Sequence, residues 1–133
     1  MSKVVHPYAH RLVTLRDWKS RWFADDANFV ENLKVDVVVR EFLEKRLRGS
    51  YVSSVEIERG QKAIRVILRT SRPGMIIGRN GEAATKLKSD IMKELKRAKL
   101  LVTDEIKLEI VEVTSPDSDA KLVAYMIAEG LEK

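Results

Sequence analysis

The chain has 133 residues, of which 44% are hydrophobic and 34% are charged, and its mean hydropathy is −0.24. This length suits a single domain, and the composition favours a soluble fold without an apolar run long enough to span a bilayer. The sequence has no cysteine and only two histidines, which excludes disulfides, thiol catalysis and cysteine-based zinc sites. We therefore expect no metal, no cofactor and no membrane association.

Basic and acidic stretches alternate along the chain, whose net charge is +5. Residues 1–23 carry five basic side chains and one acidic side chain, and residues 59–99 carry twelve basic and three acidic side chains. In residues 24–58 and 100–133 the acidic side chains outnumber the basic ones. The basic stretches favour a polyanionic partner such as nucleic acid, because Lys and Arg that neutralise phosphates release counterions. A solvated basic surface explains them equally well. The start of the chain has no apolar stretch of signal-peptide length, so we expect a cytoplasmic protein.

The first predicted region, residues 1–24, lacks a helical or strand period and is interpreted as a basic N-terminal arm. Asp25-Asp26 predicts the start of a short helix over 27–33. Asp36 predicts the start of a second helix, which ends before Gly49. The arm has no apolar face of its own, so we expect only its aromatic residues to hold it on the domain.

A hairpin and a helix follow. Apolar residues alternate with charged ones over 55–58 and 64–69, which predicts two antiparallel strands with one buried face. The outward residues are acidic on the first strand and basic on the second, so we expect ion pairs between the strands. After a glycine-containing segment, apolar spacing predicts a helix from Glu82 to Ala98 with a basic exposed side.

The last predicted elements are a strand and a helix. Alternation over Ile106–Ile110 predicts a third strand, and its interruption at Val111 predicts a bulge there. Ser115-Pro116 predicts the start of the final helix. We expect this helix to bury one apolar face, made of Leu122, Val123, Met126, Ile127 and Leu131.

The segment Ile76-Ile77-Gly78-Arg79-Asn80-Gly81 carries the most specific functional signal. Its spacing matches neither a dinucleotide-binding fingerprint nor a P-loop. Two glycines around a two-residue tip let the backbone approach a nucleic-acid strand, and the helix that follows points amide groups at phosphate. We interpret the segment as the phosphate-clamping loop of a KH module, which grips about four nucleotides. The alternative is a simple turn.

Trp18 and Trp22 are the second candidate feature. One interpretation is a helical turn that presses both indoles onto the core. The other is that one indole contacts RNA while the nearby cations hold phosphate. His6 and His10 have helical spacing, but Pro7 lies between them and no third ligand is evident, so we expect no metal site.

The sequence offers no catalytic constellation. It has no Gly-x-Ser-x-Gly motif, no cysteine and no pair of carboxylates placed for acid–base chemistry. Asp25-Asp26 and the acidic residues Asp117 and Asp119 are more economically explained as helix caps. We therefore expect a protein that is not an enzyme.

Five motifs together resemble a known family. They are Val5-His6-Pro7, Arg11-Leu12, Trp18-x-x-x-Trp22-Phe23-Ala24, Arg72-Pro73-Gly74-x-Ile76-Ile77-Gly78-Arg79-x-Gly81 and Asp119-Ala120-x-Leu122-Val123-Ala124. In this order they resemble the amino-terminal half of bacterial-type small ribosomal subunit protein three. The resemblance implies an α+β, type II KH fold in which helices cover one face of a three-stranded sheet. It also implies an RNA-binding place in the subunit head, where messenger RNA enters.

The sequence departs from this family at three places. Tyr8-Ala9 replaces the usual Asn-Gly, the connection Lys93–Asp104 looks longer than usual, and the family's carboxy-terminal domain is absent. The absence favours a domain of a longer protein, and the alternative is a naturally shortened protein. The missing domain puts any unwinding role in doubt.

These observations predict an arm over 1–24 and a type II KH domain over 25–133. The expected partners are ribosomal RNA, neighbouring small-subunit proteins and, in addition, messenger RNA. The alternatives are a free-standing KH factor in RNA regulation or ribosome maturation, and a KH-like protein-interaction domain. The predicted RNA contacts are Arg72, Ile77, Gly78, Arg79, Asn80, Gly81 and Lys86 around the loop, and Lys3, His6, Arg11, Arg16, Trp18, Lys19, Arg21 and Trp22 in the arm.

Overall fold

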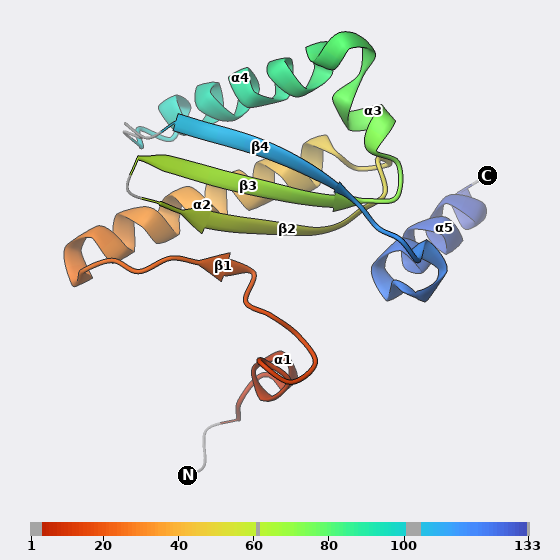
Figure 1. Cartoon of the computed structure of the whole chain (residues 1–133), viewed down its shortest axis with the longest axis horizontal. Helices are drawn as coiled ribbons and strands as arrows, with labels where there is room; N and C mark the ends of the chain where they lie inside the picture. Colours follow the sequence, from red (N-terminus) through yellow and green to blue (C-terminus); the bar gives the residue numbers. More distant parts are fainter. Residues whose placement is uncertain (1–3, 61, 101–104, 133) are drawn as a thin grey trace.

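A computed structural model describes residues 4–60, 62–100 and 105–132. A mixed sheet is covered on one face by two long helices, while the N-terminal segment and the last helix extend from its sides (Figure 1). This α+β arrangement agrees with the predicted fold class. The elements in chain order are α1 (Pro7–His10), β1 (Ser20–Arg21), α2 (Asp26–Arg46), β2 (Val52–Arg59), β3 (Ala63–Thr70), α3 (Pro73–Ile77), η1 (Arg79–Gly81), α4 (Glu82–Arg97), β4 (Glu105–Glu112), η2 (Pro116–Ser118) and α5 (Ala120–Glu132).

The sheet has four strands in the order β1-β2-β3-β4. The predicted hairpin is confirmed, because β2 and β3 pair antiparallel with Ile57 opposite Val66. The predicted third strand is β4, which lies parallel to β3 and pairs with it along its full length. The short strand β1 was not predicted. It comes from the arm and lies parallel to β2, with Ser20 opposite Ile57.

The core lies between the sheet and the helices. The inward residues of β2, β3 and β4 pack against α2 and against the face of α4 that carries Leu87, Ile91 and Leu95. Because apolar residues recur at every second position in the strands and at every third or fourth in α4, each element buries one face. The predicted helix over 82–98 is thereby confirmed.

The predicted division of residues 27–47 into two helices is wrong. The structure has one helix, α2, which runs without a break from Asp26 to Arg46. Asp36 does not cap a second helix. It is 3% exposed in the middle of α2, where side chains from the arm and from β2 satisfy its carboxylate.

Two expectations about the last third of the chain are also wrong. The pairing of β3 with β4 stays in register through Val111 and Glu112, so no bulge occurs there. The last helix, α5, begins at Ala120 after η2, and of its predicted apolar face only Leu122 is buried. No helix in the described ranges is long and apolar enough to cross a membrane.

Candidate nucleic-acid interface

The predicted loop connects two helices. The short helix α3 ends at Ile77, Gly78 turns the chain, and the single turn η1 leads into α4 at Glu82. Asn80 and Gly81 both have positive φ angles, of 51° and 76°. No side-chain hydrogen bond caps the start of α4, although its first turn carries the acidic Glu82. The positive end of the helix dipole favours an anionic ligand there.

Gly78 is required by the local geometry. Its φ and ψ angles of 71° and −174° lie in a region that is open almost only to glycine. A Cβ atom at this position would lie 2.6 Å from the Cβ of Ala83. At Gly81, by contrast, an added Cβ would meet nothing within 4 Å, although its φ angle is also positive. The backbone at Gly78 therefore lies directly against Ala83, in the first turn of α4.

The side chains around the loop are available for binding. Arg79 and Asn80 are exposed, and in the part of the chain that the structure describes Arg79 has no ion pair or hydrogen bond through its side chain. Ile77 is partly exposed beside them. Arg72, where α3 begins, lies with its guanidinium carbon 4.2 Å from the centre of the Tyr51 ring. Ile77 and Arg79 therefore place an apolar contact and a cation on either side of Gly78, while Arg72 lies at the other end of α3.

Lys86 projects from the second turn of α4. It lines a hollow of about 330 Å³ between α2, α3 and α4, together with Arg46 and Asp90. Arg46 and Asp90 approach each other to 4.0 Å. Lys86 has no ion pair among the described residues, so it adds a free cation on this flank of the loop.

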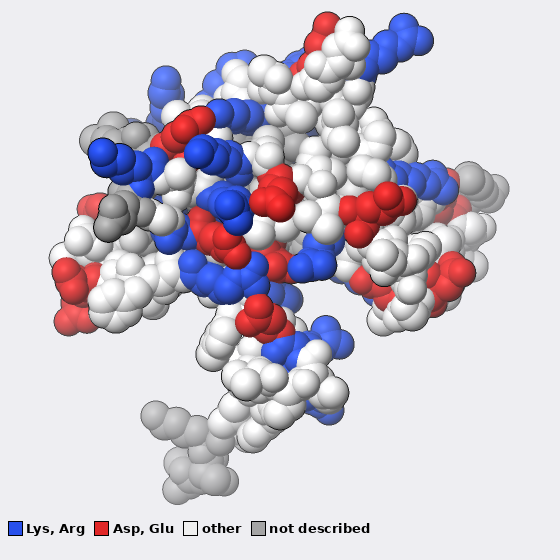
Figure 2. Space-filling model, in the orientation of Figure 1, with Lys and Arg blue, Asp and Glu red and all other residues white. Residues whose placement is uncertain are grey.

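Much of the basic excess is neutralised within the fold. Of the twelve cations in 59–99, six have a carboxylate within 4.0 Å and six have none among the described residues. On the open face of the sheet, Arg65 and Arg69 of β3 pair with Glu58 and Glu56 of β2, as predicted. Figure 2 shows blue and red side chains interleaved over this face. The charges of β2 and β3 on the open sheet face therefore largely cancel. Among the six unpaired cations of 59–99, Arg72, Arg79 and Lys86 belong to the segment that contains the loop, whereas Lys62, Lys96 and Lys99 lie before β3 and at the C-terminal end of α4.

The beginning of the arm forms one helical turn, α1. His6 caps it by accepting a hydrogen bond at Nδ1 from the amide of Tyr8, at 3.1 Å. Arg11 donates from Nη1 to the carbonyl of Pro7 at 2.8 Å. The hydroxyl of Tyr8 donates to the carbonyl of Asp17 at 2.6 Å, which folds the arm back on itself. The predicted contact Lys3 lies outside the described residues.

Two arm cations remain available next to Tyr8. Arg16 and Lys19 lie 5.6 and 5.0 Å from the centre of the Tyr8 ring, and neither has an ion pair in the described ranges. Trp18 is 56% exposed between them. Its indole therefore fits the predicted role of an RNA contact better than that of a core residue.

Trp22 attaches the arm to α2. Its Nε1 donates to Asp36 at 2.8 Å, and its ring packs against that of Phe29 with centroids 5.2 Å apart. The same carboxylate accepts from Ser20 at 3.1 Å and from Arg59 at 2.8 Å. The interpretation that both indoles press on the core from one helical turn is wrong. We call Ser20, Trp22, Asp36 and Arg59 the arm anchor.

Sequence reasoning missed Asp36 and Arg59 as partners of the arm, and it expected Phe23 to help hold the arm. Phe23 is 92% exposed instead. The only signal in the sequence was a charged residue on the apolar side of a helix, beside Val35 and Val39. A buried charge needs a partner, but the partner itself is 23 residues away on β2.

Arg21 is a structural cation. Its guanidinium lies 2.7 Å from Asp17, 2.9 Å from Glu56 and 2.7 Å from Glu58. The hydrogen bond to Glu58 raises the pKa of Arg21 above its ordinary value. This predicted RNA contact is thus engaged by three carboxylates.

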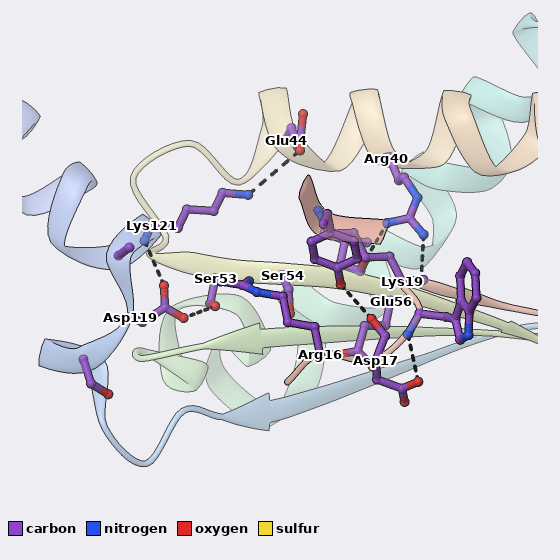
Figure 3. Close-up of a pocket in the computed structure, with 15 residues that line it drawn as sticks. Arg16, Asp17, Lys19, Arg40, Glu44, Ser53, Ser54, Glu56, Asp119 and Lys121 are labelled. Carbon is purple, nitrogen blue, oxygen red and sulfur yellow. Dashed lines mark hydrogen bonds and ion pairs between the residues drawn. The ribbon is translucent and has the colours of Figure 1, made fainter. Parts of the chain in front are cut away.

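A hollow of about 550 Å³ lies between the arm, α2, β2 and the start of α5. Figure 3 shows Arg40 pointing from α2 to the arm, where it donates to the carbonyl of Lys19 at 2.8 Å. It also donates to the carbonyl of Val55. Burial lowers the pKa of Arg40, and the nearby carboxylates of Asp36, Glu44 and Glu56 only partly oppose this.

Asp119 closes the other end of this hollow. It accepts from the hydroxyl of Ser53 and from the amides of Lys121 and Leu122, at 2.9 and 3.2 Å for the amides. Burial raises the pKa of Asp119, but these hydrogen bonds together outweigh burial, so its pKa lies below the ordinary 3.8. Arg40 and Asp119 are thus engaged within the fold, which leaves Arg16 and Lys19 as the free cations at this hollow.

Comparison with known proteins decides the family. The KH domain matches residues 38–118, from the middle of α2 to the end of η2. The chain belongs to the KH domain family. The loop from Gly78 to Gly81 lies inside the matched residues, whereas the arm, the first half of α2 and all of α5 lie outside them.

Curated relatives align with the whole chain. The small ribosomal subunit protein uS3 of Clostridium novyi is 38% identical over 133 residues, and that of Magnetococcus marinus is 41% identical over 133 residues. Each alignment includes 100% of this chain but only 58% and 60% of the relative. The chain is therefore homologous to uS3, and it spans less than two thirds of the length of these relatives.

Proposed function

We propose that this KH domain protein is a non-catalytic, RNA-binding component of the small ribosomal subunit. The observation that carries the proposal is the glycine loop. Gly78 adopts a conformation that is open almost only to glycine, next to the start of α4 and to Arg79, whose side chain has no partner in the part of the chain that the structure describes. Homology to uS3 over the whole chain supports the ribosomal setting.

The loop binds RNA through its backbone and its free cations. A phosphate approaches the backbone at Gly78 and Gly81, which carry no side chains, and the start of α4 favours its negative charge. Arg79 neutralises one phosphate, and Arg72 and Lys86 stand on either side of the loop to meet the neighbouring ones. Ile77 offers apolar contact to a base or sugar.

The arm makes a second, separate contact in this proposal. Arg16 and Lys19 hold phosphate, and the exposed Trp18 stacks on an unpaired base. His6 and Arg11 shape the arm, and Arg21 and Trp22 attach it to the domain, so these four predicted contacts act by positioning. We retain the division into an arm over 1–24 and a KH domain over 25–133 as part of the proposal.

The setting of these contacts follows from the family. We infer that the chain works in the cytoplasm, in the head of the small subunit where messenger RNA enters. Ribosomal RNA is its main partner, messenger RNA is a further one, and neighbouring small-subunit proteins complete its surroundings.

Co-sedimentation tests this function. A tagged chain expressed in bacteria should sediment with mature small subunits on sucrose gradients and crosslink to ribosomal RNA. Recovery only with immature subunits would indicate the maturation factor. Recovery away from subunits, with no RNA crosslink, would indicate the protein-interaction domain and contradict the proposal.

A further inference from the structure

The helix α2 has a second apolar face that the fold leaves about half exposed. Phe29, Val30, Leu33 and Val37 are each between 46% and 51% exposed. Val30, Leu33 and Val37 follow the spacing of one helical face, with Phe29 at its margin. This face points away from Val35, Val39 and Leu43, which α2 buries against the sheet. We call these four exposed residues the outer stripe.

An uncovered stripe of this kind marks a contact surface. A helix with apolar residues on both faces normally has protein on both sides, and grouped exposed apolar residues are typical of interaction sites. Among the described residues, α4 lies beside α2, and the arm contacts the margin of this face, where Trp22 packs against Phe29. Val30, Leu33 and Val37 remain about half exposed.

The charges around the outer stripe narrow the choice of partner. From Asp25 to Arg46 the exposed charged residues are five carboxylates and three cations, Lys34, Lys45 and Arg46. Glu44 and Arg46 are paired with Lys121 and Asp90, which leaves four carboxylates and two cations without a partner among the described residues. Arg40 is turned inward, toward the carbonyls of Val55 and Lys19. The five carboxylates belong to Asp25, Asp26, Glu31, Glu41 and Glu44.

This acidic border argues against two occupants. RNA is disfavoured, because its phosphates would face the carboxylates. A second copy of the chain is disfavoured as well, since two α2 helices packed antiparallel by their stripes would bring Asp25 and Asp26 of one copy near Glu41 and Glu44 of the other. Like charges across an interface oppose association.

We propose that the outer stripe binds an amphipathic helix of another protein, whose apolar face is flanked by Lys and Arg. Side chains three and four residues apart on such a helix fit between Val30, Leu33 and Val37. Its cations then meet the acidic border. This site is separate from the glycine loop, and the inference does not depend on the RNA-binding function.

Two synthetic peptides test the proposal. Both form an 18-residue helix with a leucine stripe, and one carries Lys on its flanks where the other carries Glu. The Lys peptide should bind the chain at least about tenfold more tightly than the Glu peptide. The double substitution Leu33→Ser/Val37→Ser should weaken binding of the Lys peptide by about tenfold or more. The matched control is Met126→Ser/Ile127→Ser on α5, whose residues are 40% and 59% exposed; it should leave the affinity unchanged.

Two further measurements keep the outcome unambiguous. Sedimentation of the chain alone should show a monomer, and an outer-stripe-dependent dimer would overturn the proposal in favour of a second copy. RNA affinity should be unaffected by Leu33→Ser/Val37→Ser, and its loss would assign the outer stripe to RNA instead.

Two outcomes of the peptide experiment would also overturn the proposal. One is equal binding of both peptides to the chain, and the other is equal binding of the Lys peptide to wild type and to Leu33→Ser/Val37→Ser. The loop variant Arg79→Asp/Asn80→Asp should bind the Lys peptide as tightly as wild type does. Loss of RNA binding at the loop is therefore distinguishable from loss of peptide binding at the outer stripe.

Discussion

The glycine loop and the arm differ in how they present their charge. At the loop, Arg79 and Lys86 have no carboxylate partner in the described structure, and the backbone conformation is set by neighbours within five residues. In the arm, Arg21 is held by three carboxylates and Trp22 by Asp36, a residue of α2. A basic stretch in the sequence therefore includes cations that bind ligands and cations that hold the fold. Only the contacts within the structure tell them apart.

The largest expected effect is at the arm anchor. Asp36→Ala leaves Arg59 buried without its carboxylate and removes the acceptor of Trp22 and Ser20. Breaking a buried ion pair on one side costs about 3–5 kcal/mol, so the free energy of unfolding should fall by about that amount. Urea denaturation measures it, and tryptophan fluorescence should shift as Trp22 loses its place.

The matched control for the anchor is Arg21→Met. Its three ion pairs lie nearer the surface, where such pairs contribute about 0–1 kcal/mol each. If Asp36→Ala lowers the free energy of unfolding by no more than Arg21→Met does, the arm is not held by the arm anchor.

The second effect concerns the loop. Gly78→Ala forces a Cβ to within 2.6 Å of Ala83 at a φ angle of 71°, and we expect a loss of about 3 kcal/mol in unfolding free energy from strain and overlap. Gly81→Ala meets no atom within 4 Å and should cost only about 1–2 kcal/mol for its positive φ angle. Equal losses at the two glycines would contradict the contact between the turn and α4. Thermal denaturation of both variants makes the comparison.

A smaller effect is expected at Asp119, beside the arm. Asp119→Ala removes the cap of α5 and should cost about 1 kcal/mol. Because the folded-state pKa of Asp119 lies below the ordinary 3.8, its carboxylate stabilises the fold above that pH, and this contribution is lost as the pH falls through the lowered pKa. Asp119→Asn keeps a capping oxygen but cannot ionise. Urea denaturation should therefore show that Asp119→Asn is less stable than wild type at pH 7 and equally stable in strong acid. A difference that grows in acid would mean that the pKa of Asp119 is raised in the fold and not lowered.

Elements that depend on nearby residues could be predicted from the sequence. The strands β2, β3 and β4, the helix α4 and the loop from Gly78 to Gly81 follow from local periodicity and glycine spacing, and they were predicted. The strand β1 and the anchor were not, because both depend on residues distant in the chain. Ser20 has no strand signal of its own and becomes a strand by pairing with β2. Similarly, α2 looked like two helices because Asp36 interrupts its apolar pattern, and the ion pair with Arg59 is what allows it there.

The central claim is that the glycine loop, rather than the arm, is the principal RNA contact. The test replaces exposed residues only. Arg79→Asp/Asn80→Asp places two carboxylates at the loop tip, and Arg16→Ala/Lys19→Ala removes the free cations of the arm without touching its anchor. Surface changes of this kind should alter the unfolding free energy by no more than about 0.5 kcal/mol.

The decisive measurement is the affinity of wild type and both variants for a fluorescent single-stranded RNA at several salt concentrations. Wild-type affinity should fall steeply with salt. The loop variant should bind at least about tenfold more weakly, with a salt slope shallower by about 1 or more for the lost phosphate contact, and the arm variant should lose less. A loop variant that melts like wild type and binds RNA equally well would contradict the account.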